Sequence, residues 1–183
     1  MDEITLINGC KNSDMQARRE LYELFADGML GLCYRYMNNP DVAHDLLHDG
    51  FLRVYSAISS FTYRGEGSLK AWLTKLFTNV CLAYLRKKDL LRETVLPEDI
   101  SDLPDEQETD EGTAELPIEI LMGFVLDLPQ GYRTVFNLYV FEEWSHKEIA
   151  RELRINEHSS ASQLLRARKL LARRITEYRE QYG

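Results

Sequence analysis

Residues 145–175 read SHKEIARELRINEHSSASQLLRARKLLARRI, and this stretch decides the fold of the C-terminal part of the chain. Its first residues have the form of a capping box, in which Ser145 and Glu148 satisfy each other's backbone N–H groups at a helix start. Ala150 supplies a small residue where a second helix can cross closely, and Ile155 supplies an apolar residue for the turn. The pattern predicts a helix-turn-helix.

The second helix of this pair begins with polar side chains and continues with basic ones. The polar residues are His158, Ser159, Ser160, Ser162 and Gln163, and the basic ones are Arg166, Arg168, Lys169, Arg173 and Arg174. Polar side chains suit base edges in the DNA major groove, and basic ones suit phosphates. A plain helical hairpin with a solvated basic face is the alternative. The tight turn and the order of polar and basic residues favour DNA binding.

The rest of the chain also has helical periodicity. In the N-terminal part, Ser13 to Gln16 has the form of another capping box. Apolar residues recur every three to five positions from Val42 to Ile58 after Pro40, which predicts a long amphipathic helix. Ser68 can cap a further helix with an apolar stripe from Leu69 to Ala83. No run alternates with a period of two for long enough to form a strand, so the fold class is all-α.

An acidic segment divides the chain. Residues 93–119 hold eleven acidic side chains and no Lys or Arg, whereas the remaining residues hold 22 basic and 19 acidic ones. The net charge of −8 therefore hides a slightly basic remainder, which is compatible with a nucleic-acid partner. Sparse apolar residues predict a linker over 93–117. The expected organisation is two small helical domains, 1–92 and 118–183, joined by this linker.

Composition excludes several classes of protein. No run approaches the roughly 18 consecutive apolar residues that a membrane helix needs, so membrane insertion is not expected. The acidic start Met1-Asp2-Glu3 lacks the order of a signal peptide, which predicts a cytoplasmic location. The three cysteines are far apart and form no Cys-x-x-Cys pair, so we expect buried thiols without zinc or redox chemistry.

Aromatic and basic residues alternate between Phe61 and Arg92. Seven basic and two acidic residues lie between Arg64 and Arg92, among Tyr63, Trp72, Phe77 and Tyr84. Aromatic faces beside cations are typical of proteins that bind single-stranded nucleic acid, because they stack on bases and neutralise the backbone. For Trp72 and Phe77, burial in the core is the alternative.

His44 and His48 are four residues apart and share one helix face. Such a pair could bind zinc with a carboxylate, but no further His or Cys lies nearby in the sequence to complete a site. A solvated face or a protein-docking face is the alternative, and no metal site is predicted.

Three segments together resemble the extracytoplasmic-function (ECF) sigma factors of the sigma-70 family. Residues 41–55, DVAHDLLHDGFLRVY, resemble the helix that binds core RNA polymerase. Residues 61–73, FTYRGEGSLKAWL, and their continuation to Lys88 resemble the segment that melts promoter DNA and reads the −10 element. Segments 128–136, 145–150 and 162–169 resemble the domain that reads the −35 element. In such factors Gly50 often has an apolar counterpart and Thr78 an arginine.

The resemblance implies a role for each segment. It implies polymerase contacts, on the clamp helices of β′, by Asp45, His48, Asp49, Phe51 and Arg53. It implies −10 contacts by Tyr63, Arg64, Lys75, Asn79, Arg86, Lys87 and Lys88, and a loop at 62–67 that helps to capture a flipped base. It implies −35 contacts by Lys147, His158, Ser159, Ser160, Ser162, Gln163, Arg166, Arg168 and Lys169.

The expected function is that of a non-catalytic specificity subunit. It has no cofactor and no catalytic residues, and its partners are core RNA polymerase (β′ and β subunits), promoter DNA and an anti-sigma factor. Two alternatives remain. A helix-turn-helix regulator would bind DNA without polymerase, and an enzyme built on His44 and His48 would hold a metal.

Overall fold

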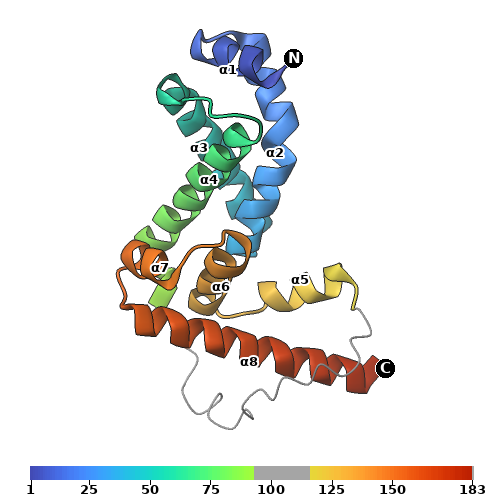
Figure 1. The fold of residues 1–183 in the computed structure, drawn as a ribbon. Coiled ribbons are helices and arrows are strands. Elements are labelled where there is room, and N and C mark those ends of the chain that lie inside the picture. The colour runs from blue at the N-terminus through green and yellow to red at the C-terminus, as the bar shows by residue number, and fades with distance from the viewer. Residues whose placement is uncertain (93–115, 183) are drawn as a thin grey trace. The chain divides into compact units, whose positions relative to one another are not determined.

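The computed structural model describes residues 1–92 and 116–182. It divides into two compact units, Met1–Lys87 (unit 1) and Lys88–Gly183 (unit 2), which are considered separately (Figure 1). The described residues form helices and turns without a β-strand, which confirms the all-α prediction. The division falls a few residues before position 92, where the sequence analysis ended the first domain. The predicted linker lies outside the described residues, except for Leu116 and Pro117.

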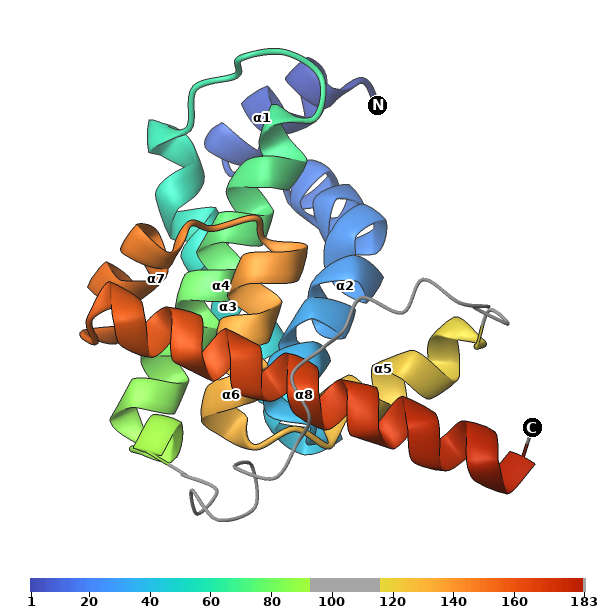
Figure 2. The same cartoon turned by 60° about the horizontal axis from the view of Figure 1, so that its bottom comes forward.

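Unit 1 is a bundle of three long helices with a short helix at one end. The long helices are α2 (Met15–Met37), α3 (Pro40–Ala57) and α4 (Ser68–Lys87), and the short one is α1 (Glu3–Lys11). A 3-10 turn, η1 (Ile58–Ser60), follows α3. Figures 1 and 2 show that the loop from η1 to α4 passes beside α1.

Side-chain caps fix where these helices begin. Asp2 accepts a hydrogen bond from the Thr5 backbone at the start of α1, and Asn39 accepts two at the start of α3, where Pro40 takes the first position. The capping residue of α2 is Asp14, which accepts from Ala17 N at 2.8 Å. The predicted cap at Ser13 is therefore wrong by one residue.

The core of unit 1 depends on a close contact between α3 and α4. Phe77 is fully buried and its ring lies edge-on to Phe51, with centroids 5.3 Å apart. A Cβ atom added at Gly50 would lie 2.1 Å from Cε1 of Phe77. Gly50 is thus where the α4 ring meets the α3 backbone, and glycine leaves room for that contact.

The described part of unit 2 contains four α-helices and two short turns. They are η2 (Leu90–Arg92), α5 (Ile118–Leu126), α6 (Gln130–Phe136), a π-helical turn η4 (Asn137–Phe141), α7 (His146–Leu153) and α8 (Glu157–Tyr182). Leu128 and Tyr132 form a buried cluster with Ala167 of α8. Phe136, together with Leu170 and Leu171 of α8, packs against it. Tyr178 extends the contact along α8 by packing against Phe124 of α5.

Helices α7 and α8 form the predicted helix-turn-helix. The capping box at Ser145 is present, with both Ser145 and Glu148 making their bonds. Arg154 has the left-handed conformation that ends α7, and Asn156 accepts a 2.7 Å bond from Ser159 N at the start of α8. Ala150 is buried as expected.

Among the described residues, no helix is both long and apolar enough to cross a membrane.

Candidate functional site

One face of α3 is exposed and mainly charged. Asp45, His48, Asp49 and Arg53 all lie on it, as the sequence analysis predicted for a docking helix. Leu52 lies among them with 66% of its surface exposed. Leu52 is not among the residues predicted for docking, although its position off the apolar stripe of α3 indicates that it is exposed. Together these side chains form a charged face with one apolar residue that a partner could cover.

Phe51 does not belong to this face. It is 3% exposed, and its ring packs against Tyr22 at 4.8 Å as well as against Phe77. Its side chain is therefore part of the core, and the predicted polymerase contact by Phe51 is withdrawn. The apolar stripe of α3 faces α2 and α4, and Phe51 is part of that stripe.

The loop between η1 and α4 has a defined shape. Gly65 and Gly67 have φ values of 115° and 81°, which side-chain-bearing residues rarely adopt. The Ser68 hydroxyl accepts a hydrogen bond from Arg64 N at 3.2 Å, and Ser68 N donates to the Gly65 carbonyl at 3.1 Å. Tyr63 and Arg64 are exposed on the loop, as expected of residues that meet DNA.

A cavity of about 380 Å³ opens beside this loop, within the range of small-ligand pockets. It is lined by Ser60, Phe61, Thr62, Arg64, Ser68, Ala71 and Trp72. The Trp72 ring lies 5.1 Å from the Phe61 ring and is only half-buried, so it is neither a plain core residue nor a free surface residue. The cavity offers an aromatic face and a cation, which an unstacked base requires.

Basic and polar residues continue from the cavity along α4. Lys75, Asn79 and Arg86 are exposed at spacings that place them on one side of the helix, and Lys87 and Lys88 are exposed at its end. Thr78 is buried, so its side chain is not part of this surface. The α4 surface can follow a nucleic-acid backbone away from the cavity.

On α7 and α8 the predicted DNA-binding residues are mostly accessible. Lys147, His158 and Arg168 are exposed, and Ser159, Ser162, Gln163, Arg166 and Lys169 are half-buried. The guanidinium of Arg168 lies 5.7 Å above the Tyr139 ring, so this arginine also contacts η4.

Ser160 is the exception on α8. It is 0% exposed, and its hydroxyl lies 2.9 Å from Nδ1 of His146 at the start of α7. The His146 ring in turn stacks on Tyr139 at 4.7 Å. Ser160 joins the two helices instead of facing outward, and its predicted DNA contact is withdrawn. The sequence showed a run of polar residues but not which of them pointed inward.

The described residues support neither a metal site at the two histidines nor a reactive cysteine. His44 and His48 are exposed, and within residues 1–92 and 116–182 no group of three or more His, Cys, Asp or Glu side chains could hold a metal ion. Cys10, Cys33 and Cys81 are buried and form no disulfide bond. Burial raises the pKa of the Cys10 thiol, which disfavours the reactive thiolate.

Comparisons with known proteins agree with this arrangement. The family model for Sigma-70 region 2 matches residues 21–90, and the model for Sigma-70 region 4 matches residues 118–171. The chain is 27% identical over 153 residues to the ECF RNA polymerase sigma factor SigM of Bacillus subtilis, covering 83% of this chain and 91% of SigM. It is 26% identical over 194 residues to SigW of the same organism, covering 93% and 95%.

A solved structure has a similar fold. It is the sigma factor RpoE of Bartonella quintana in complex with the anti-sigma factor NepR, with a TM-score of 0.51 and 19% identity. The match covers 86% of this chain and 96% of that one. The two family matches span most of the chain and coincide with the helices that carry the exposed surfaces. The chain belongs to the sigma-70 family of RNA polymerase sigma factors, in its extracytoplasmic-function group.

Proposed function

We propose that this ECF sigma factor binds core RNA polymerase through the exposed face of α3 and contacts promoter DNA through two separate surfaces. Sigma factors direct promoter-specific initiation as non-catalytic subunits, and the polymerase performs the chemistry. The observation that carries the proposal is the exposed charged face of α3 around Leu52, on the same unit as the cavity and the basic side of α4.

The α3 face suits a protein partner. Its acidic and basic side chains surround the exposed Leu52, so a partner can bury an apolar residue at the centre and pair charges around it. By resemblance, the partner is the clamp-helix region of the β′ subunit. In such factors Glu and Gln often stand at the positions that His44 and His48 take on this face.

The 62–67 loop and α4 suit melted DNA at the −10 element. An unstacked base enters the cavity and stacks on Trp72, while Arg64 and Lys75 neutralise the backbone. Asn79, Arg86, Lys87 and Lys88 extend the contact along the strand. Tyr63 lies at the rim of this surface.

Helix α8 suits duplex DNA at the −35 element. Its N-terminal residues His158, Ser159, Ser162 and Gln163 face base edges in the major groove, and Arg166, Arg168 and Lys169 approach phosphates. Lys147, at the start of α7, adds a backbone contact. The helix-turn-helix geometry and the accessibility of these side chains support this assignment.

Polymerase is needed to combine the two DNA contacts. Two weak binding surfaces on one chain strengthen each other only when their separation matches the separation of their targets. The 93–117 segment joins the units, and bound polymerase would set their spacing on the promoter.

Because a sigma factor acts on the transcription machinery, we infer a cytoplasmic location for this protein. The β subunit and an anti-sigma factor are further partners that we propose.

A pull-down with core RNA polymerase tests the docking surface. Asp49→Lys reverses a charge on the α3 face and is expected to abolish co-purification, because like charges at a protein contact are strongly unfavourable. Glu23→Lys, at an exposed site on α2, is the matched control and should bind as the wild type does. Capture that survives Asp49→Lys and other reversals on this face would refute the docking assignment.

Run-off transcription from genomic fragments then identifies the promoters. Holoenzyme made with the wild type should initiate at defined sites, and core alone should not. A helix-turn-helix regulator without polymerase docking would instead bind those fragments specifically in the absence of polymerase, and no new transcript would appear.

A further inference from the structure

Helix α1 contacts both ends of the 62–67 loop. At one end, Lys11 Nζ donates a 2.7 Å hydrogen bond to the carbonyl oxygen of Phe61, in a partly buried position. At the other end, Glu3 Oε1 accepts a 3.3 Å bond from Leu69 N, in the first turn of α4. The loop is thus bonded to one short helix on both sides, by residues 50 and 66 positions away.

The two bonded positions border the cavity. The Phe61 ring packs on Trp72, and both residues line the cavity. Leu69 follows Ser68, whose hydroxyl accepts the bond from Arg64 N. A shift of Phe61 or of the α4 start would therefore move the cavity walls.

Glu3 is close to a second part of the loop. Desolvation raises the pKa of the Tyr63 hydroxyl, and the nearby carboxylates of Glu3 and Glu66 raise it further. The charge of Glu3 thus acts on the exposed tyrosine of the loop as well as on the α4 backbone.

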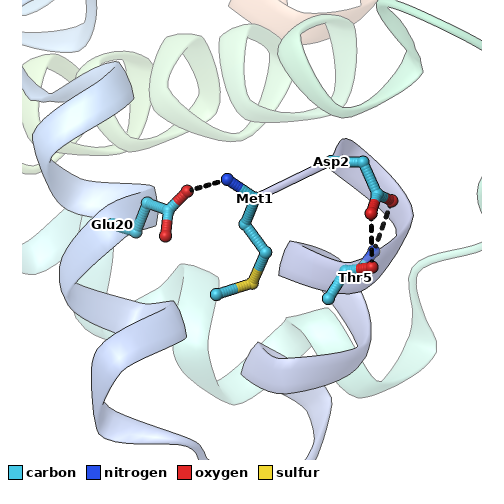
Figure 3. Close-up of polar contacts among 4 residues, drawn as sticks. All are labelled: Met1, Asp2, Thr5 and Glu20. Atoms are coloured by element: carbon cyan, nitrogen blue, oxygen red, sulfur yellow. Dashed lines mark hydrogen bonds and ion pairs between the residues drawn. The ribbon is translucent and has the colours of Figure 1, made fainter.

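Helix α1 is itself tied to the bundle. The amino group of Met1 lies 2.7 Å from Glu20 Oε1 of α2. Asp2 accepts hydrogen bonds from both the backbone N–H and the hydroxyl of Thr5, and Figure 3 shows these contacts. These bonds raise the pKa of the Met1 amino group and lower that of the Asp2 carboxyl. The side chains of Leu6, Ile7 and Cys10 of α1 are buried. Because α1 is anchored in this way, its two hydrogen bonds can hold the loop in one position.

We propose that Glu3 and Lys11 of α1 are positioning residues, which keep the 62–67 loop in the shape that accepts an unstacked base. This inference rests on the proposed function, because the loop acts there as the base-capturing element. Helix α1 lies outside the segment matched by the region 2 family model. Its role is to order the loop before DNA arrives, so that the entropy of ordering is not lost at the moment of binding.

Hydrogen–deuterium exchange on the full chain tests the positioning directly. Glu3→Ala and Lys11→Met remove the two bonds, and exchange in peptides covering residues 62–70 should rise about tenfold. Glu3→Gln keeps an acceptor oxygen and Lys11→Arg keeps a donor, so both should retain slow exchange. Arg19→Met is the control for loss of a cation, because Arg19 is exposed on α2 and pairs with Glu23.

Two exchange results would overturn the proposal. The first is unchanged exchange in the loop in both Glu3→Ala and Lys11→Met. The second is an equal rise in α2, α3 and α4, because α1 would then contribute general stability without a specific action on the loop. A fast loop in Glu3→Gln would also count against the hydrogen bond and in favour of a simple charge effect.

A functional test uses holoenzyme on a premelted promoter from the run-off experiment, with an abasic nucleotide placed at each position of the −10 strand in turn. The wild type should lose affinity mainly at one position. Glu3→Ala and Lys11→Met should bring the ratio of intact to abasic affinity at that position close to one, and Glu3→Gln and Lys11→Arg should keep it. Affinity for an upstream duplex should not change.

The two failures are distinguishable. If the wild type shows no such position, base capture by the loop is wrong, and the positioning of that capture fails with it whatever the exchange data show. If the wild type shows one and both bond-removing variants keep the full ratio, base capture stands and the positioning role of α1 is refuted.

Discussion

The two candidate DNA-binding surfaces are built in opposite ways. In unit 1 the surface is a cavity beside an irregular loop, and its shape depends on bonds from a separate helix, through Glu3 and Lys11. In unit 2 the surface is one side of a continuous helix, α8, whose orientation depends on the contact with α7. A cavity suits a base removed from the stack, and a helix suits the major groove of an intact duplex.

This difference predicts how each surface fails. Core changes in unit 1 should disturb the loop side without altering α8, and changes at the α7–α8 contact should do the reverse. The chain has two tryptophans, Trp72 in unit 1 and Trp144 in unit 2, so each unit has its own fluorescent reporter.

The largest expected effect is that of Gly50→Ala. The new methyl group would overlap the Phe77 ring, and overpacking of this kind costs about 1–3 kcal/mol, against a gain in helix propensity of up to about 1 kcal/mol. The free energy of unfolding of unit 1 should fall by about 1–2 kcal/mol. Urea unfolding followed by Trp72 fluorescence, in a Trp144→Phe background, measures it.

Gly28→Ala is the matched control. Gly28 is also helical, and an added methyl group would meet no atom within 4 Å, so this change should stabilise unit 1 by about 0.5–1 kcal/mol. Equal stability of the two variants would contradict the packing role assigned to Gly50.

Ser160→Ala should have a smaller effect, confined to unit 2. It removes the buried hydrogen bond to His146, which is worth about 1 kcal/mol. Trp144 fluorescence in a Trp72→Phe background should show the loss of stability. Ser162→Ala, two residues along the same helix, should leave stability unchanged and weaken −35 binding; the opposite pattern would restore Ser160 to the DNA-binding surface.

Arg166→Ala should have the smallest effect. If Arg166 meets a phosphate, upstream DNA binding by holoenzyme weakens for all sequences, and the slope of log affinity against log salt falls by about one. Arg19→Ala, in unit 1, should leave that slope unchanged. A loss for some sequences only would show instead that Arg166 reads a base.

The regular parts of the fold could be predicted from local sequence. The capping box at Ser145 and the small residue at Ala150 act within a few residues, and their geometry follows from helix chemistry alone. The charged face of α3 and the basic side of α4 likewise follow from helical periodicity.

Tertiary contacts decided the remainder. Ser160 lies in a run of polar residues, and only its hydrogen bond to His146 of the neighbouring helix shows that it points inward. Phe51 differs, because it lies on the apolar stripe of α3 and helical periodicity alone already indicates its burial. Gly50 is a potential weak point within an isolated helix but a site of close packing once Phe77 lies against it. The bonds of Glu3 and Lys11 join residues far apart in the chain, which local patterns do not reveal.

In the proposed function, one polymerase-bound chain contacts a promoter at two places with a fixed separation. Run-off transcription from a promoter with about five base pairs inserted between its −35 and −10 elements tests this most directly, because half a helical turn moves one element to the opposite side of the duplex. We predict that initiation falls to the level of core polymerase alone. Initiation that is insensitive to the insertion would contradict simultaneous contact by the two surfaces.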